Sequence, residues 1–185
     1  MKISPLLAFV LFPVLTACSD DSEAAPSPSG AVDDGCPRET LELDIAYTPR
    51  TGPKVDASGA LMAPPGSGYV VSTTFLRLRP GDEAGRRFAE LFGPIAVQLQ
   101  NQPGLLALQL ATSADCGTAR TLSVWSSLEA MYDFVASDTH QTAVNAVSEV
   151  SRGGSTVLHW SAETVEQASW QEAARRLADA KGPFY

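Results

Sequence analysis

Two histidines, His140 and His159, are the side chains of this sequence best suited to acid–base chemistry. An imidazole changes its charge close to neutral pH, so it can give or take a proton there. His140 follows an apolar helical stripe and stands fifteen residues after Trp125. It could act as a general acid or base or bind a ligand, and it could equally cap the helix or lie exposed. His159 lies in a stretch that alternates like a strand, and we predict a structural role for it.

Other signatures of catalysis are absent from the sequence. It contains no P-loop, GxGxxG, GxSxG, CxxC or HExxH motif, and its two histidines are too few for a dense metal cluster. We therefore expect neither a metal site nor a cofactor. No basic stripe with interleaved aromatic residues is present either, so we do not expect nucleic-acid binding.

The composition is that of one folded domain with appendages. A chain of 185 residues with 44% apolar content can bury one good core. The formal net charge is -8, but five acidic residues lie within residues 19–35, which contain no basic residue. From Cys36 onward, 12 basic residues face 16 acidic ones. A charge of -4 is too weak to indicate a class of partner.

The N-terminus carries the three parts of a secretory signal. Lys2 supplies the positive charge, residues 6–15 are an apolar run, and small residues precede Cys18. The run is shorter than the about 20 residues that span a bilayer. Leu15-Thr16-Ala17-Cys18 resembles a bacterial lipobox, whose cysteine is lipidated and becomes the first mature residue. We predict a lipoprotein signal peptide over residues 1–17 and lipidation of Cys18, the alternative being an ordinary signal peptide with an incidental cysteine.

Residues 18–35 are polar and rich in serine, proline and acidic side chains. Such a composition buries too little apolar surface to fold, so we expect a disordered tether. Ser19, directly after the cysteine, resembles the signal for sorting to the outer membrane of Gram-negative bacteria. We therefore expect a membrane-anchored protein of the cell envelope. It would face the periplasm from the outer membrane of a Gram-negative source, or lie on the outer face of a Gram-positive plasma membrane.

Export to an oxidising compartment favours a disulfide between the two remaining cysteines. Once Cys18 is lipidated, Cys36 and Cys116 form an even pair in an oxidising compartment. We predict a disulfide that joins the end of the tether to a loop between two strands, the alternative being two unrelated thiols. Closing so long a loop would restrict the unfolded chain by roughly 4 to 5 kcal/mol in the entropic account.

Periodic patterns divide the rest of the chain into short elements. Strands are expected at residues 41–47, 69–78, 105–112, 120–125 and 155–161. Helices are expected at residues 82–102, with a kink or restart at Gly93-Pro94, and at 127–137, 141–150 and 169–180. Ser126 and Ser169 each precede a glutamate by three residues, which is the spacing of a capping box. We expect an N-terminal extension over residues 36–68, with one strand and a Pro- and Gly-rich connection, followed by one domain over residues 69–185.

The order of these elements from residue 69 onward is βαββαβ. It predicts an α+β fold, a ferredoxin-like antiparallel sheet with helices on one face. Both faces of the strand at residues 105–108 are apolar, so the other face of the sheet needs a second layer.

The stretch Ser123–His140 carries a family resemblance. It follows W-S-x-x-E-A-x-x-x-F-x-x-S-x-x-H, with a helical stripe at residues 128, 131, 132 and 135. This pattern resembles the dimeric α/β-barrel superfamily, and within it the antibiotic-biosynthesis-monooxygenase group. The resemblance covers residues 69–185, and it implies a homodimer in which a second subunit supplies the missing layer and closes a barrel.

Within that fold we expect a pocket between the helix layer and the barrel. The residues expected to border it are Thr74, Trp125, Tyr132, His140 and His159. Trp125 could equally serve core or dimer packing. Thr74 stands where several members of the family have an asparagine, which weakens a transferred mechanism. Phe134 and Val144 stand where the haem-degrading branch has Trp and His, so haem degradation is disfavoured.

Two functions remain open from the sequence. The resemblance implies a cofactor-independent monooxygenase acting on a polycyclic or phenolic small molecule, with His140 as proton donor or acceptor and Trp125 shaping the pocket. Export to a compartment without a nicotinamide pool favours such a cofactor-free route. The alternative is a lipid-anchored binding or scaffold module that uses the same fold without turnover.

Overall fold

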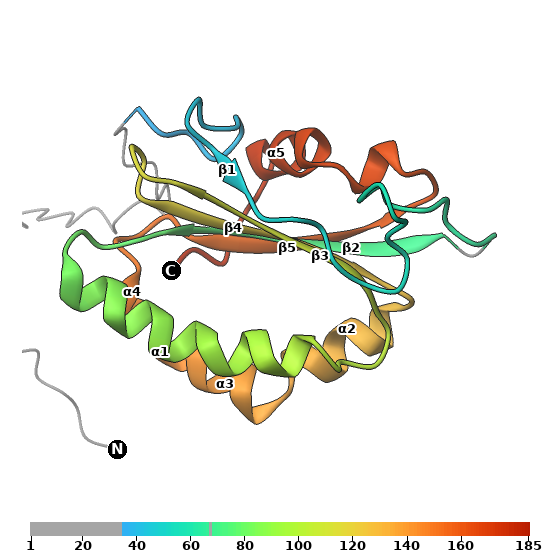
Figure 1. The fold of residues 1–185 in the computed structure, drawn as a ribbon. Helices are drawn as coiled ribbons and strands as arrows, with labels where there is room; N and C mark the ends of the chain where they lie inside the picture. The colour runs from blue at the N-terminus through green and yellow to red at the C-terminus, as the bar shows by residue number, and fades with distance from the viewer. Residues whose placement is uncertain (1–34, 67) are drawn as a thin grey trace, which may run out of the picture.

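The computed structural model describes residues 35–66 and 68–185 of the chain (Figure 1). The predicted signal peptide, Cys18 and nearly all of the predicted tether lie outside these residues. In the described part, no helix combines the length and the apolar character needed to cross a membrane.

Five strands form one antiparallel sheet. They are β1 (Ala46–Tyr47), β2 (Tyr69–Arg77), β3 (Leu105–Ser113), β4 (Thr118–Trp125) and β5 (Thr156–Ala162). Their order across the sheet is β1-β3-β4-β2-β5. β2 therefore pairs with both β4 and β5, and β4 also pairs with β3. This order confirms the predicted α+β, ferredoxin-like βαββαβ fold.

The helices lie on both faces of this sheet. They are α1 (Asp82–Leu99), α2 (Leu128–Val135), α3 (Asp138–Asn145), α4 (Val147–Val150) and α5 (Trp170–Ala178), with a short 3-10 helix, η1 (Glu166–Ala168), before α5. Figure 1 shows α1 to α4 together on one face, as predicted. The prediction is wrong for α5, which lies on the opposite face beside β1, where Trp170 and Ala173 join the apolar cluster of that face.

Serine side chains set the starts of three helices. Ser127, Ser137 and Ser169 each accept a hydrogen bond from the backbone N–H three residues later, at α2, α3 and α5. The predicted cap at Ser169 is confirmed. The predicted cap at Ser126 is wrong by one residue, because the Ser126 N–H still donates to the Gly104 carbonyl at 2.8 Å and keeps that residue attached to the sheet.

The predicted restart at Gly93-Pro94 is also wrong, since α1 runs through Pro94 without interruption. A proline inside a helix cannot donate to the carbonyl four residues earlier, which destabilises that turn. The apolar stripe continues on both sides of it and buries Leu91 and Leu99. Packing of this stripe therefore holds the helix together where the local sequence favours a break.

The predicted strand at residues 41–47 is largely wrong. Only its last two residues, β1, pair with β3, and a turn precedes them. Burial is also the reverse of the predicted alternation, because Glu42 is 9% exposed whereas Leu43 is fully exposed. The cause is an ion pair across the fold, in which Oε2 of Glu42 lies 2.9 Å from Nε of Arg120 in β4.

The face of the sheet opposite α1–α4 is covered by the chain itself. Residues of the sheet, of η1 and α5, and of the leading segment, residues 36–66, share one apolar cluster (Figure 1). Its buried members are Leu61, Tyr69, Val71, Ala107, Ala111, Leu122, Val124, Trp160, Ala162, Ala168, Trp170 and Ala173. The packing argument for a second subunit, that this face would be bare, is therefore wrong. A homodimer remains a prediction that rests on the resemblance alone.

Both ends of the described chain are attached to the sheet. The predicted disulfide between Cys36 and Cys116 is present, with Cα atoms 5.7 Å apart. Since Cys116 lies in the turn between β3 and β4, the bond ties the start of the leading segment to that hairpin. At the C-terminus, Tyr185 exchanges two backbone hydrogen bonds with Ser155, of 2.8 and 3.1 Å.

Candidate functional site

The side chains between the sheet and α1–α4 form the candidate site, because this layer keeps contact with solvent. The β2 residues that face the opposite apolar cluster are only 0 to 3% exposed. The residues that alternate with them, and so face α1–α4, are only partly buried: Val70, Ser72, Thr74 and Leu76. A fully packed interface would bury both rows alike. The β2 residues beneath the helices therefore keep partial contact with solvent.

Trp125 forms an apolar wall of this layer. It lies at the end of β4 and is 1% exposed. Its ring stacks on Phe134 of α2 with centroids 5.5 Å apart, and its Nε1 donates to Oγ of Ser123 at 2.9 Å. Because its ring is buried and its one polar atom is satisfied within the protein, Trp125 packs in the core behind the site, as the alternative of core packing predicted.

His140 lies in the first turn of α3, whereas the sequence predicted it between a helix at residues 127–137 and a second helix at residues 141–150. The turn that brings it there is fixed by Ser137, whose Oγ accepts the His140 N–H at 3.3 Å. The edge of the imidazole packs against Phe134, with ring centroids 4.8 Å apart. Trp125, Phe134 and His140 therefore form one continuous aromatic series from the sheet to α3.

The hydrogen bonding of His140 assigns its tautomer. Nδ1 lies 3.1 Å from the carbonyl of Val135, the last residue of α2. A carbonyl can only accept, so Nδ1 carries the hydrogen and Nε2 of the neutral ring is an acceptor. No protein group within the described ranges bonds to Nε2, which leaves it open to a ligand.

Burial lowers the pKa of His140 below its ordinary value of 6.5, because half-buried apolar surroundings penalise the charged imidazolium. The hydrogen bond to the Val135 carbonyl opposes this shift without cancelling it. His140 is therefore a neutral ring at pH 7. A neutral imidazole with a free Nε2 can take a proton from a bound molecule.

Tyr132 and His159 bring α2 and β5 together at the edge of the sheet. Their rings meet edge to face with centroids 5.8 Å apart. Tyr132 is 49% exposed and His159 is exposed as well, so this contact borders the site from the solvent side. The predicted helical stripe is wrong at Tyr132 and at Leu128, which is 44% exposed, because Phe134 occupies the buried position of α2 instead.

Thr74 lies on the same face of the sheet but apart from the aromatic rings. It pairs with Thr121 of β4 and with Val157 of β5, and its N–H donates to Oγ1 of Thr121 at 3.2 Å. Ser72, two residues earlier, pairs with His159. This row of hydroxyl groups gives the sheet side of the site a polar floor.

The structure thus brings together some of the predicted site residues and not others. Trp125 and His140 are joined through Phe134, Tyr132 meets His159, and Thr74 shares only their face of the sheet. The sequence analysis noted Phe134 only as the residue that stands where the haem-degrading branch has Trp. It missed that Phe134 contacts both Trp125 and His140. The signal available was its spacing of three residues from Met131, since both are buried on one side of α2.

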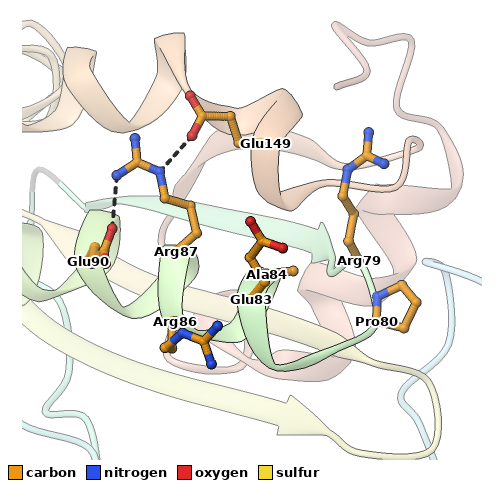
Figure 2. A pocket seen from close by; sticks show the side chains of 8 residues that line it. All are labelled: Arg79, Pro80, Glu83, Ala84, Arg86, Arg87, Glu90 and Glu149. Atoms are coloured by element: carbon orange, nitrogen blue, oxygen red, sulfur yellow. Dashed lines mark hydrogen bonds and ion pairs between the residues drawn. The ribbon is translucent and has the colours of Figure 1, made fainter.

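A hollow on the surface lies elsewhere, at the start of α1. Its volume is about 650 Å³, and it shares no lining residue with the candidate site (Figure 2). Arg87 there is neutralised by Glu149 and Glu90, whose oxygens lie 2.6 and 3.1 Å from its nitrogens. The described residues also contain no group of three or more His, Cys, Asp or Glu side chains that could hold a metal ion.

Most of the candidate site falls within a segment that resembles a known family. Residues 70–146 match the model of the antibiotic biosynthesis monooxygenase family. The match runs from β2 through α3, so it includes Thr74, Trp125, Tyr132 and His140 and excludes His159 and the leading segment. No curated protein sequence matches the chain.

Several solved structures have a partly similar backbone. Rv0793 from Mycobacterium tuberculosis is 18% identical, with a TM-score of 0.45, over 50% of this chain and 92% of that one. A conserved protein from Methanosarcina mazei Go1 is 11% identical, with a TM-score of 0.46, over 51% and 93%. SnoaB, a cofactor-independent oxygenase from Streptomyces nogalater, is 17% identical in a mutant form, with a TM-score of 0.44, over 52% and 95%.

Proposed function

We propose that this protein binds an aromatic small molecule between the sheet and helices α2 and α3, and oxygenates it without a cofactor. The observation that carries the proposal is the state of His140, a neutral ring whose Nε2 is free to accept a proton. The buried rings of Phe134 and Trp125 pack behind it and give the imidazole apolar surroundings. The family match over residues 70–146 supports the same class of reaction.

In the proposed reaction, His140 takes an acidic proton from the substrate, from a phenol or from a ring CH₂ made acidic by a neighbouring carbonyl. The resulting anion passes one electron to O₂, and the two radicals combine to a peroxide anion on a ring carbon that carries a hydrogen. His140 returns its proton to the outer oxygen, which gives a hydroperoxide and restores the neutral ring. Loss of water from the peroxide leaves a carbonyl, so one oxygen atom enters the product and the other leaves as water. The substrate supplies every electron, and the step needs no reductant.

One contact favours a second function, binding without turnover. The bond from Nδ1 of His140 to the Val135 carbonyl ties the start of α3 to the end of α2. A histidine whose role is to join two helices would leave a ligand site without a base. In this alternative the protein is a lipid-anchored binding or scaffold module.

The enzyme and the binding module differ in the effect that His140→Gln should have on oxygen uptake. Glutamine keeps an N–H for the Val135 carbonyl but cannot take a proton at neutral pH. Oxygen uptake above the buffer rate is measured with 1,8-dihydroxyanthrone as probe, and binding of the probe by quenching of tryptophan fluorescence. For an enzyme we expect uptake to fall by about 100-fold or more with binding kept, which is the usual range for a lost general base.

Glu172→Gln provides the control, because this carboxylate pairs with Arg175 and Arg176 on α5, across the sheet from the site, so the variant should keep both uptake and binding. Wild-type protein that binds the probe without consuming oxygen would support the binding module. If the wild-type protein does not bind the probe, or if His140→Gln consumes oxygen at the wild-type rate, the proposed enzyme is wrong.

We further propose that the protein is exported and held on a membrane of the cell envelope by a lipid on Cys18. The lipobox-like Leu15-Thr16-Ala17-Cys18 and the polar residues after it support this anchor. A Cys18→Ala variant should move from the membrane fraction to the soluble fraction of lysed cells, because no acyl chain remains to hold it. Equal membrane association of the variant and the wild type would refute the anchor.

A further inference from the structure

The leading segment, residues 36–66, lies along the free edge of β3 like an added strand. Beyond β1, the N–H of Thr48 donates to the carbonyl of Leu110 at 2.9 Å. Thr51 and Leu108 exchange two bonds of 2.9 and 2.8 Å, and Lys54 donates to Leu106 at 3.0 Å. Backbone groups that would otherwise form an open edge are therefore paired within the chain.

The same segment then turns over the face of the sheet. Leu61 is buried in the apolar cluster of that face, and Leu41, Ile45 and Val55 pack against it. Oη of Tyr69 in β2 lies 3.0 and 3.1 Å from the carbonyls of Met62 and Ala63, so the phenol holds the end of the segment down. The segment thus covers apolar surface that a single exposed sheet cannot leave bare.

A buried guanidinium holds the start of the segment. Arg120 is 2% exposed, and its Nη1 and Nη2 donate to the backbone carbonyls of Arg38 and Thr40 at 3.1 and 2.8 Å. Its Nε binds the carboxylate of Glu42, which also accepts from Thr118 at 2.6 Å. A charge that is buried this deeply needs such partners.

These partners all come from the leading segment of the same chain, and the Cys36–Cys116 bond holds that segment in place. A second copy could take the same face only by displacing the segment. Arg120 would then lose the carboxylate and the two carbonyls that compensate its buried charge.

We propose that the leading segment takes the place of a second subunit, so that one chain completes its own core and the protein acts as a monomer. The candidate site between the sheet and α2 and α3 then needs no residue from a partner. The disulfide and the Glu42–Arg120 pair are the two locks that keep the segment in place. This inference does not depend on whether the site is catalytic.

Sedimentation velocity of the unlipidated Cys18→Ser protein at micromolar concentration tests the proposal. We expect the mass of one chain. A variant that also carries Glu42→Gln, Cys36→Ser and Cys116→Ser loses both locks, and we expect its mass to rise with concentration while its circular dichroism spectrum stays that of a folded protein. Glu172→Gln is the matched control, because it neutralises a carboxylate that pairs with Arg175 and Arg176 on α5, and it should remain a single chain.

A mass of two chains for the Cys18→Ser protein would overturn the proposal. The proposal would also be overturned if the variant without both locks stayed folded and monomeric at every concentration. If the variant without both locks unfolds, hydrogen exchange of the protein that keeps both locks tests whether the leading segment is docked. Protection of the Leu108 and Leu110 amides equal to that of the central strands would support a docked segment, because these amides donate to Thr51 and Thr48. Exchange as fast as that of a free strand edge would overturn it.

Discussion

The carbonyl of Val135 decides which nitrogen of His140 carries the hydrogen, and with it what the side chain can do. Since Nδ1 donates to that carbonyl, Nε2 is the only atom of the ring available to a ligand. The same contact caps α2, so the structural and the chemical alternatives left open by the sequence are both present in one side chain. The sequence singled out His140 as a candidate, but it placed this residue beyond a helix end and gave no sign of the bond to Val135.

At the scale of this residue, stability should depend on pH. Burial lowers the pKa of His140 below 6.5, so below about that pH the unfolded chain binds a proton that the folded chain does not. The free energy of unfolding should therefore fall as the pH drops below 6.5, and this loss should stop once the pH is below the lowered folded pKa. Urea unfolding at a series of pH values, for the wild type and His140→Gln, measures it.

Glutamine does not titrate in this range, so the difference in stability between the two proteins should change in favour of His140→Gln as the pH falls. A difference that is the same at neutral and at acidic pH would contradict the lowered pKa.

Helix α2 shows how the boundary of an element depends on its neighbours. The capping-box spacing predicted Ser126, but this residue is bound to Gly104 at the end of the sheet, and Ser127 takes the extended conformation that an N-cap requires. The side of α2 that is buried is likewise chosen by packing, since Phe134 is placed against Trp125 while Leu128 and Tyr132 remain exposed.

Substitution of Ser126 and of Ser127 tests which of the two serines caps α2. Ser127→Ala should lower the free energy of unfolding by about 1 kcal/mol, because the Ala130 N–H loses its acceptor at 3.1 Å. Ser126→Ala, one residue earlier, should change it far less. Chemical denaturation of both variants measures the effect, and a larger loss for Ser126→Ala would show that the cap is assigned to the wrong residue.

At the scale of the whole molecule, a single disulfide joins the leading segment to the sheet and closes a long loop. The Cys36–Cys116 bond spans 80 residues of sequence, from the start of the leading segment to the β3–β4 turn. It restricts the unfolded chain over the leading segment, β2, α1 and β3. This region includes the buried Glu42 that binds Arg120, so the closure and the ion pair act on the same part of the fold.

Loss of this bond should cost up to about 4 to 5 kcal/mol in the free energy of unfolding, as expected for a loop of this length in the entropic account. Urea unfolding of the Cys18→Ser protein with and without the further Cys36→Ser and Cys116→Ser substitutions measures the loss. Thiol titration of the unfolded Cys18→Ser protein should show free thiols only after reductant is added. A thiol count that reductant does not change would mean that the bond is absent.

The sequence by itself determined the four strands from residue 69 onward, the βαββαβ order and the pairing of Cys36 with Cys116. Local periodicity, capping residues and parity of cysteines carry that information, because they act between residues close in sequence or through composition. Only the tertiary structure decided that Glu42 is buried, that Phe134 joins Trp125 to His140, and that the leading segment covers the second face of the sheet. The burial of Glu42 and the covering of the sheet depend on contacts between segments far apart in the chain, such as Glu42 with Arg120, and no pattern within either segment encodes its partner. The position of Phe134 depends on which side of α2 packs against the sheet, which the helical pattern alone left open.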